Sequence, residues 1–154
     1  MAHYSPDFTL KINEIAGVCP AGEAYAQKCM AEKKIPVFSC EGPCIRGEIA
    51  RLAANIVANE IPSFARACHA ETFFVPHSSM LRWVKDAEKA IMIDGCFLTC
   101  HGRVLKNLIG EAKSHRSTLF PSTRNTSTSS RWRTFQRRSG KRWHDRWPTR
   151  LWPC

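Results

Sequence analysis

Long apolar runs are absent from this sequence of 154 residues. No stretch approaches the roughly 18 consecutive apolar residues that a membrane-spanning helix needs. The opening run Met-Ala-His-Tyr-Ser-Pro-Asp also lacks the basic stretch and apolar segment of a secretory signal. We therefore expect a soluble, cytoplasmic protein with no membrane partner.

Three common functional motifs are missing as well. The sequence contains no glycine-rich phosphate loop, no serine nucleophile elbow and no helical His-Glu-x2-His. These motifs support phosphate binding, acyl transfer and zinc-dependent proteolysis respectively. The usual nucleotide-binding, hydrolase and protease classes therefore lack support, and we assign no catalytic or organic-cofactor residue.

Acidic residues are scarce at one end of the chain. The formal net charge is +10, but residues 1–113 hold 13 basic and 12 acidic residues, whereas residues 114–154 hold 10 basic residues and one acidic residue. The positive charge therefore belongs to the C-terminal part. Because the remainder is nearly neutral, it lacks the basic surface that nucleic-acid binding requires.

Composition divides the chain into three parts. Residues 1–34 are expected to form a helical lead-in with a break at Pro20-Ala21-Gly22, and residues 35–112 an α/β metal-binding domain. Residues 113–154 form a basic tail rich in Arg, Ser and Trp, which we expect to be poorly ordered. Three alternatives stay open for this tail: a frame-shifted sequence, a non-specific extension, and an arm in which Arg and Trp contact single-stranded nucleic acid.

Cysteine, by contrast, is abundant, with eight residues in the chain. In a reducing cytoplasm such cysteines are rarely disulfide-bonded and more often bind metal or perform redox chemistry. Cys19 and Cys29 match no compact metal-binding spacing, and we interpret them as small apolar residues. The remaining cysteines of residues 35–112 follow a repeated pattern.

The first copy of this pattern begins at Ile35–Ser39, a short apolar run with the length of a buried strand. Cys40-Glu41-Gly42-Pro43-Cys44 follows as a turn, and Pro43 suits the first turn of a helix. An apolar stripe at helical spacing comes next. Its members are Ile45, Ile49, Leu52, Ile56 and Val57.

The second copy has the same order. Ala90–Ile93 is a short apolar run, and Asp94-Gly95 ends it because glycine permits turn conformations that other residues avoid. Cys96 and Cys100 follow, with a helix expected to start near Phe97. The inward positions of that helix and its C-terminal cap are predicted at His101, Val104, Leu105, Leu108 and Gly110.

Strands that alternate with helices predict an α/β fold, in which helices flank a small, mainly parallel sheet. Between the two copies, residues 64–70 fit either a strand or a helical turn, and a helix capped by Ser78 or Ser79 runs to about Ala87. Right-handed crossovers bring every strand-to-helix turn to one edge of the sheet. Cys40, Cys68 and Cys96 are therefore expected to meet there, where ligands of open α/β sheets bind.

Two Cys-x3-Cys pairs suit a tetrahedral zinc ion, with sulfur ligands at about 2.3 Å. An iron–sulfur cluster uses the same residue type and is the less favoured cofactor. The candidate metal ligands are Cys40, Cys44, Cys68, Cys96 and Cys100.

The run Ile91-Met92-Ile93-Asp94-Gly95-Cys96-x3-Cys100, preceded by Val37-Phe38-Ser39-Cys40-x-Gly42, resembles the DGC domain family, which takes its name from the Asp-Gly-Cys motif. The resemblance covers roughly residues 35–110. It implies a zinc-binding protein without an established activity, whose ligands match Cys40, Cys96 and Cys100. A cysteine after the middle strand would match Cys68, whereas the first turn is one residue longer here than in some members.

A thiol-based redox or transfer enzyme is the alternative function, with Cys96 or Cys100 as the nucleophile. Its histidine base would be His69, His77 or His101. Asp94 is expected to cap the turn after its strand or to support the site from behind. Apart from the metal ion and the nucleic acid considered for the basic tail, the sequence indicates no partner, and it does not indicate the oligomeric state.

Overall fold

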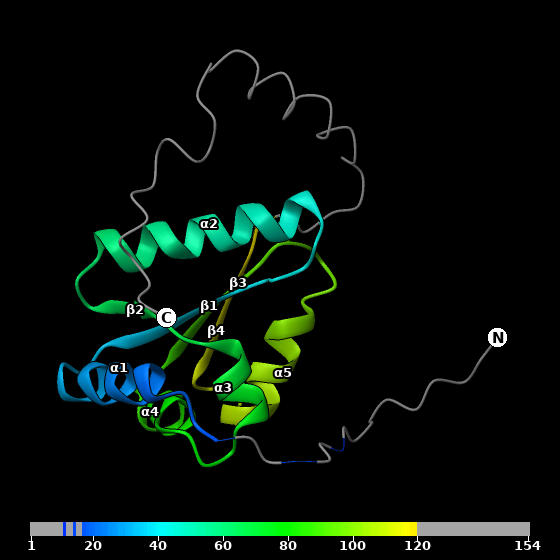
Figure 1. Ribbon diagram of the computed structural model, residues 1–154. Coiled ribbons are helices and arrows are strands. Elements are labelled where there is room, and N and C mark those ends of the chain that lie inside the picture. Colours follow the sequence, from blue (N-terminus) through cyan, green and yellow to red (C-terminus); the bar gives the residue numbers. More distant parts are fainter. Residues whose placement is uncertain (1–10, 12–13, 15–16, 120–154) are drawn as a thin grey trace.

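A computed structural model describes residues 11, 14 and 17–119. Its elements follow one another as α1 (Pro20–Ala31), β1 (Ile35–Ser39), α2 (Ile45–Glu60), β2 (Phe64–Arg66), α3 (His69–Phe74), α4 (Ser79–Asp86), β3 (Ala90–Asp94), α5 (Cys100–Ile109) and β4 (Ser114–Thr118). The four strands form one parallel sheet in the order β2-β1-β3-β4 (Figure 1). The predicted α/β fold is confirmed. Within the described ranges, no helix has the length and apolar character needed to cross a bilayer.

Helices cover both faces of the sheet. Helix α2 lies on one face, and α1, α3, α4 and α5 lie on the other (Figure 1). Because neighbouring strand residues point to opposite faces, Phe38 joins the core beneath α1, α4 and α5, whereas Val37 packs against α2. The larger core layer contains Trp83, Met80, Met92 and Leu105, while the α2 layer is built mainly on alanine and valine.

The strand order creates a switch point between β1 and β3. The chain leaves β1 toward α2 on one face and leaves β3 toward α5 on the opposite face. The two loops therefore diverge at the carboxyl edge of neighbouring strands, which is where open α/β sheets bind their ligands. Both predicted Cys-x3-Cys turns lie in these two loops.

The buried faces of two helices differ from the predicted stripes. Helix α2 buries Gly47, Ala50 and Ala54, and Ile56 is 46% exposed. Small residues allow close packing: a Cβ added at Gly47 would collide with the carbonyl oxygen of Gly42. In α5 the buried positions are Gly102 and Leu105, and Val104 is exposed. Leu105 was predicted correctly from the spacing of large apolar residues, whereas Gly47, Ala50, Ala54 and Gly102 were missed because they are small.

Helix α1 begins at Pro20, so the expected break at residues 20–22 is wrong. Pro20 occupies the first turn, where its missing N–H leaves nothing unsatisfied, and the Cys19 sulfur accepts a hydrogen bond from the Gly22 N–H at 3.4 Å. Cys29 is buried in the core, as expected of a small apolar residue, whereas Cys19 is exposed. The apolar stripe of Phe8, Ile12 and Ile15 lies outside the described residues.

Strand β4 corrects the predicted end of the domain at residue 112. Ser114 to Thr118 pair in parallel with Ala90 to Asp94. This edge strand consists of polar, mostly exposed residues. It lacks the run of apolar residues that predicts a strand, so the sequence pattern does not distinguish it from the basic tail. The tail hypotheses for residues 120–154 concern a segment outside the described residues.

Glu71 connects α3 to the start of α1. Its side chain is only 6% exposed, and its Oε1 accepts a 2.7 Å hydrogen bond from the Cys19 N–H. We expect Glu71→Ala to lower the free energy of unfolding by about 2 kcal/mol, because a charge-assisted bond to a helix terminus is lost. Urea denaturation measures the change, with Glu88→Ala as the exposed control. A loss no larger than that of the control would contradict the assignment.

Candidate functional site

The five predicted metal ligands lie where β1, β2 and β3 give way to helices. Cys40 follows β1 directly, Cys96 follows β3 after Gly95, and both are partly buried. Cys44 and Cys68 occupy the N-cap positions of α2 and α3, and Cys100 is the first residue of α5. These last three are exposed, and all five thiols are free. The carboxyl edge of the sheet therefore carries every predicted ligand.

The segment after β1 contacts β3, and the segment after β3 packs against the start of α2. The Cys40 N–H donates to the Ile93 carbonyl at 2.9 Å, and a Cβ added at Gly95 would lie 2.5 Å from the Arg46 carbonyl oxygen. Gly95 does not have a positive φ. The glycine of Asp-Gly-Cys is thus required for close approach of the α2 backbone, and not for an unusual turn conformation as expected.

The second Cys-x3-Cys turn is not part of a continuous helix. Helix α5 begins at Cys100, three residues later than the expected start near Phe97. Thr99, which precedes it, has a left-handed φ of 46°, an uncommon conformation for a β-branched residue. Strained backbone of this kind concentrates at functional sites. Cys96 and Cys100 are therefore separated by a non-helical turn.

Two Cys-His dipeptides meet at this edge. His69 follows Cys68, and His101 follows Cys100. The rings of His69 and His101 contact each other edge to face, with centroids 5.2 Å apart. Their contact brings the starts of α3 and α5 together. The third histidine considered as a base, His77, lies on the exposed loop before α4.

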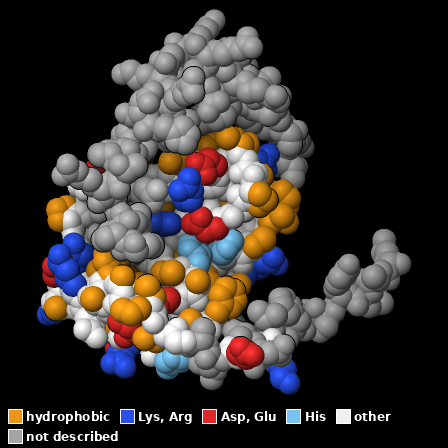
Figure 2. All heavy atoms as spheres, viewed as in Figure 1, with side chains coloured by type: hydrophobic (Ala, Val, Ile, Leu, Met, Phe, Trp, Pro, Cys, Tyr) orange, Lys and Arg blue, Asp and Glu red, His pale blue; other side chains and the backbone are white. Residues whose placement is uncertain are grey.

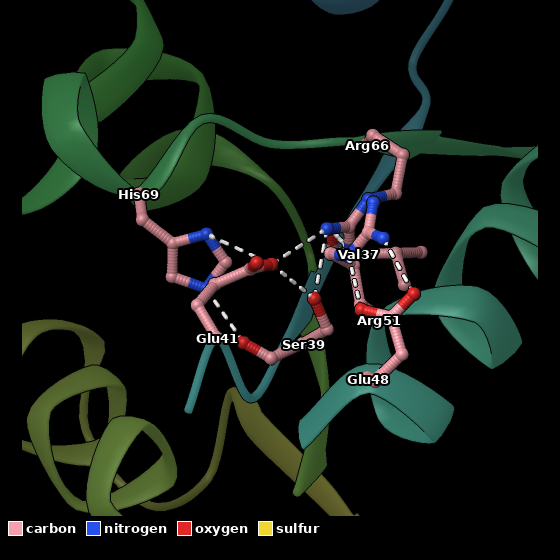
Figure 3. A network of polar contacts seen from close by, with 7 residues as sticks. All are labelled: Val37, Ser39, Glu41, Glu48, Arg51, Arg66 and His69. Carbon is pink, nitrogen blue, oxygen red and sulfur yellow. Dashed lines mark hydrogen bonds and ion pairs between the residues drawn. The ribbon is translucent and has the colours of Figure 1, made fainter. Parts of the chain in front are cut away.

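A polar network lies beside these histidines (Figure 3). Arg66, the last residue of β2, donates to Ser39 Oγ at 2.8 Å and to Glu41 Oε1 at 3.2 Å. Ser39 Oγ donates to the same Glu41 oxygen at 2.6 Å, and His69 Nε2 lies 2.8 Å from the Ser39 carbonyl oxygen. Charged side chains and histidines gather in the middle of this face, bordered by hydrophobic ones (Figure 2).

Burial sets the protonation of His69. Desolvation lowers the pKa of its imidazole to about 4, although the nearby Glu41 opposes the shift. The ring packs edge-on against Phe38, which accounts for the burial. His69 is thus neutral near pH 7. Because a carbonyl can only accept, Nε2 carries the hydrogen, which leaves Nδ1 as an acceptor 3.9 Å from Glu41 Oε1.

Asp94 of the Asp-Gly-Cys motif is 1% exposed. Neither carboxylate oxygen has a hydrogen-bond partner among the described residues, so the expected turn cap is not formed. The side chain lies instead against Gly102 in the first turn of α5, where a Cβ would collide with Oδ2. Burial raises the pKa of Asp94, and the nearby backbone N–H of Gly102 and the positive charge of Arg116 act in the opposite direction.

The donor atoms fit zinc in kind, since free thiols and imidazoles are its preferred ligands. Within residues 11, 14 and 17–119, however, no three His, Cys, Asp or Glu side chains lie close enough together to hold a metal ion. Closing a thiolate site would therefore require the loops at this edge to draw together. The five cysteines stay predicted ligands.

The family model of the DGC domain matches residues 36–119, which is 84 of the 154 residues. The chain belongs to the DGC domain family. The match includes all five candidate cysteines and extends through β4, so the DGC domain ends beyond the predicted residue 112. No curated protein and no solved structure matches the chain.

Sequence reasoning missed the polar network of this DGC domain. Arg66 and Glu41 are 25 residues apart, and no spacing rule links them. The only signal was positional: Ser39 ends the predicted strand Ile35–Ser39, and such residues reach the carboxyl edge. Arg66 lay inside the ambiguous segment 64–70, and only the structure ends β2 at this residue.

Proposed function

We propose that this DGC domain protein binds one zinc ion through cysteine thiolates at the carboxyl edge of its sheet. The candidate ligands are Cys40, Cys44, Cys68, Cys96 and Cys100, with Cys40, Cys96 and Cys100 as the core of the set. The observation that carries the proposal is that both Cys-x3-Cys turns lie at one switch point, where Cys40 after β1 bonds to β3 and Gly95 after β3 lies against the start of α2.

A zinc ion held by four thiolates has no open position for water, so its role would be structural or sensory. The chain's own residues would supply the supporting shell. Gly95 lets the loop after β3 approach the start of α2. Asp94 lies against Gly102 in the first turn of α5, which follows the second Cys-x3-Cys turn. Outer residues of this kind orient metal ligands and tune their affinity.

A thiol-based redox or transfer enzyme is the second candidate. It is favoured by one observation: Cys100 is exposed at the first residue of α5, next to the paired rings of His69 and His101. A helix N-terminus stabilises a thiolate. In this function Cys100 or Cys96 would be the nucleophile.

Metal content and thiol reactivity separate the two functions. We expect protein purified without added metal to contain about one zinc per chain, and about four additional thiols to react after a chelator is added. A chain without metal, in which thiols at this edge react at once, would contradict zinc binding and favour the enzyme.

A further inference from the structure

We propose that Ser39, Arg66 and His69 form a binding pocket for the oxyanion group of a small ligand, and that the carboxylate of Glu41 occupies this pocket when the ligand is absent. The pocket lies beside the cysteine-bearing turns, because Cys40 precedes Glu41 and Cys68 precedes His69. It does not depend on zinc binding.

The donors of this pocket are buried and prearranged. The Arg66 side chain is only 16% exposed, and Ser39 is fully buried. Arg66 Nη1 is anchored by the Val37 carbonyl oxygen at 3.2 Å, so the guanidinium is held with Nη2 toward Glu41. A buried guanidinium is stable only when an acceptor or an anion neutralises it. The buried Arg66 guanidinium is therefore a site that favours a negatively charged group.

The group that fills the site comes from a loop. Glu41 lies between β1 and α2, outside regular structure, and its side chain is 35% exposed. Its Oε1 accepts hydrogen bonds from both Ser39 and Arg66, as the oxygen of a bound oxyanion would (Figure 3). Ligands of open α/β sheets bind at this switch point. An anionic ligand and the Glu41 carboxylate would therefore compete for the same donors.

His69 determines which kind of ligand oxygen the pocket would favour. Its Nδ1 faces Glu41 Oε1 at 3.9 Å, too far for a hydrogen bond, and it is an acceptor because Nε2–H is directed to Ser39. A ligand oxygen that carries a proton could donate to Nδ1, whereas a carboxylate cannot. The pocket offers one fixed cation and one acceptor, which suits a singly charged oxyanion or a hydrogen-bearing tetrahedral one.

A neighbouring ion pair provides the control. Glu48 and Arg51 pair within α2 at 2.7 Å, and both side chains are more than 40% exposed. This pair is an ordinary surface contact, drawn beside the network in Figure 3. Removing Glu48 changes the net charge by the same amount as removing Glu41 but leaves the buried donors covered.

The test is a titration of the full chain with inorganic phosphate and, separately, with acetate, followed by amide NMR shifts of residues 39–41 and 66–69. We expect Glu41→Ala to bind one of these probes about tenfold more tightly than the wild type, since an internal competitor at roughly millimolar effective concentration is gone. Glu48→Ala should bind as the wild type does, and Glu41→Ala combined with Arg66→Gln should lose binding. Preference for phosphate indicates a hydrogen-bearing tetrahedral group and preference for acetate a carboxylate.

Equal affinity in Glu41→Ala and the wild type would overturn the proposal, as would retention of binding without Arg66. If Glu41→Ala does not fold, Glu41→Gln replaces it, because the amide keeps the shape and removes the charge. In that variant the expected gain is smaller but still exceeds that of Glu48→Gln, and its absence would equally overturn the proposal.

Discussion

Replacing Cys96 by serine is expected to remove zinc from the purified protein, lowering its content from about one ion per chain to near zero. Cys96 lies just after Gly95, in the loop between β3 and α5 that packs against the start of α2. A hydroxyl is a poor zinc ligand at neutral pH, whereas a thiolate binds strongly. The remaining thiols of the site should then react without a chelator.

The same substitution should change stability in a defined way. A metal that binds only the folded chain stabilises it by about 4 kcal/mol when free zinc is 1,000 times its dissociation constant. The melting temperature of Cys96→Ser should therefore fall to that of chelator-treated wild type, and a chelator should not lower it further. The two apolar layers that flank the sheet do not involve this residue, so the fold itself should persist.

Cys19→Ser is the matched control. Cys19 caps α1 through its sulfur and lies outside the loops of the proposed site. Serine is a favoured N-cap residue, so this variant should keep its zinc and its stability. If Cys96→Ser retains zinc as well, the proposed site is wrong at its central ligand.

Adding a single methyl group at Gly95 is expected to destabilise the protein by about 3 kcal/mol, at the upper end of overpacking costs. The new Cβ would lie 2.5 Å from the Arg46 carbonyl oxygen and 3.0 Å from the Gly47 nitrogen. Both are backbone atoms of α2, and they cannot turn away as a side chain could. The loop after β3 must then move away from the start of α2, which separates the two Cys-x3-Cys turns, so Gly95→Ala should also weaken zinc binding.

Chemical denaturation of Gly95→Ala measures the loss, and Gly17→Ala is its control because a Cβ added at Gly17 meets nothing within 4 Å. Unchanged stability in Gly95→Ala would show that the loop after β3 can move away from α2 without a loss of free energy of unfolding. Loss of stability with full zinc content would show instead that the loop contact supports the fold without supporting the metal.

Local patterns in the sequence were sufficient to predict the two strand–turn–helix units. Short apolar runs, a glycine or proline at the turn and helical periodicity depend only on residues near one another in the chain. They placed β1 and β3 correctly, with cysteines at the ends of both strands. Because right-handed crossovers bring such turns to one edge, the position of the candidate site also followed from the sequence, as did the family.

Tertiary structure decided the features that depend on distant residues. Strand β4 is polar and forms a strand only because β3 offers it a parallel partner, so no local signal distinguished it from the tail. The packed face of α2 is made of small residues, whose role is visible only once the sheet and the preceding loop lie against them. The Glu41–Arg66 contact joins a residue of the loop after β1 to the last residue of β2, which is 25 residues away in the chain. In each case the deciding interaction is one that chain folding, and not sequence proximity, brings about.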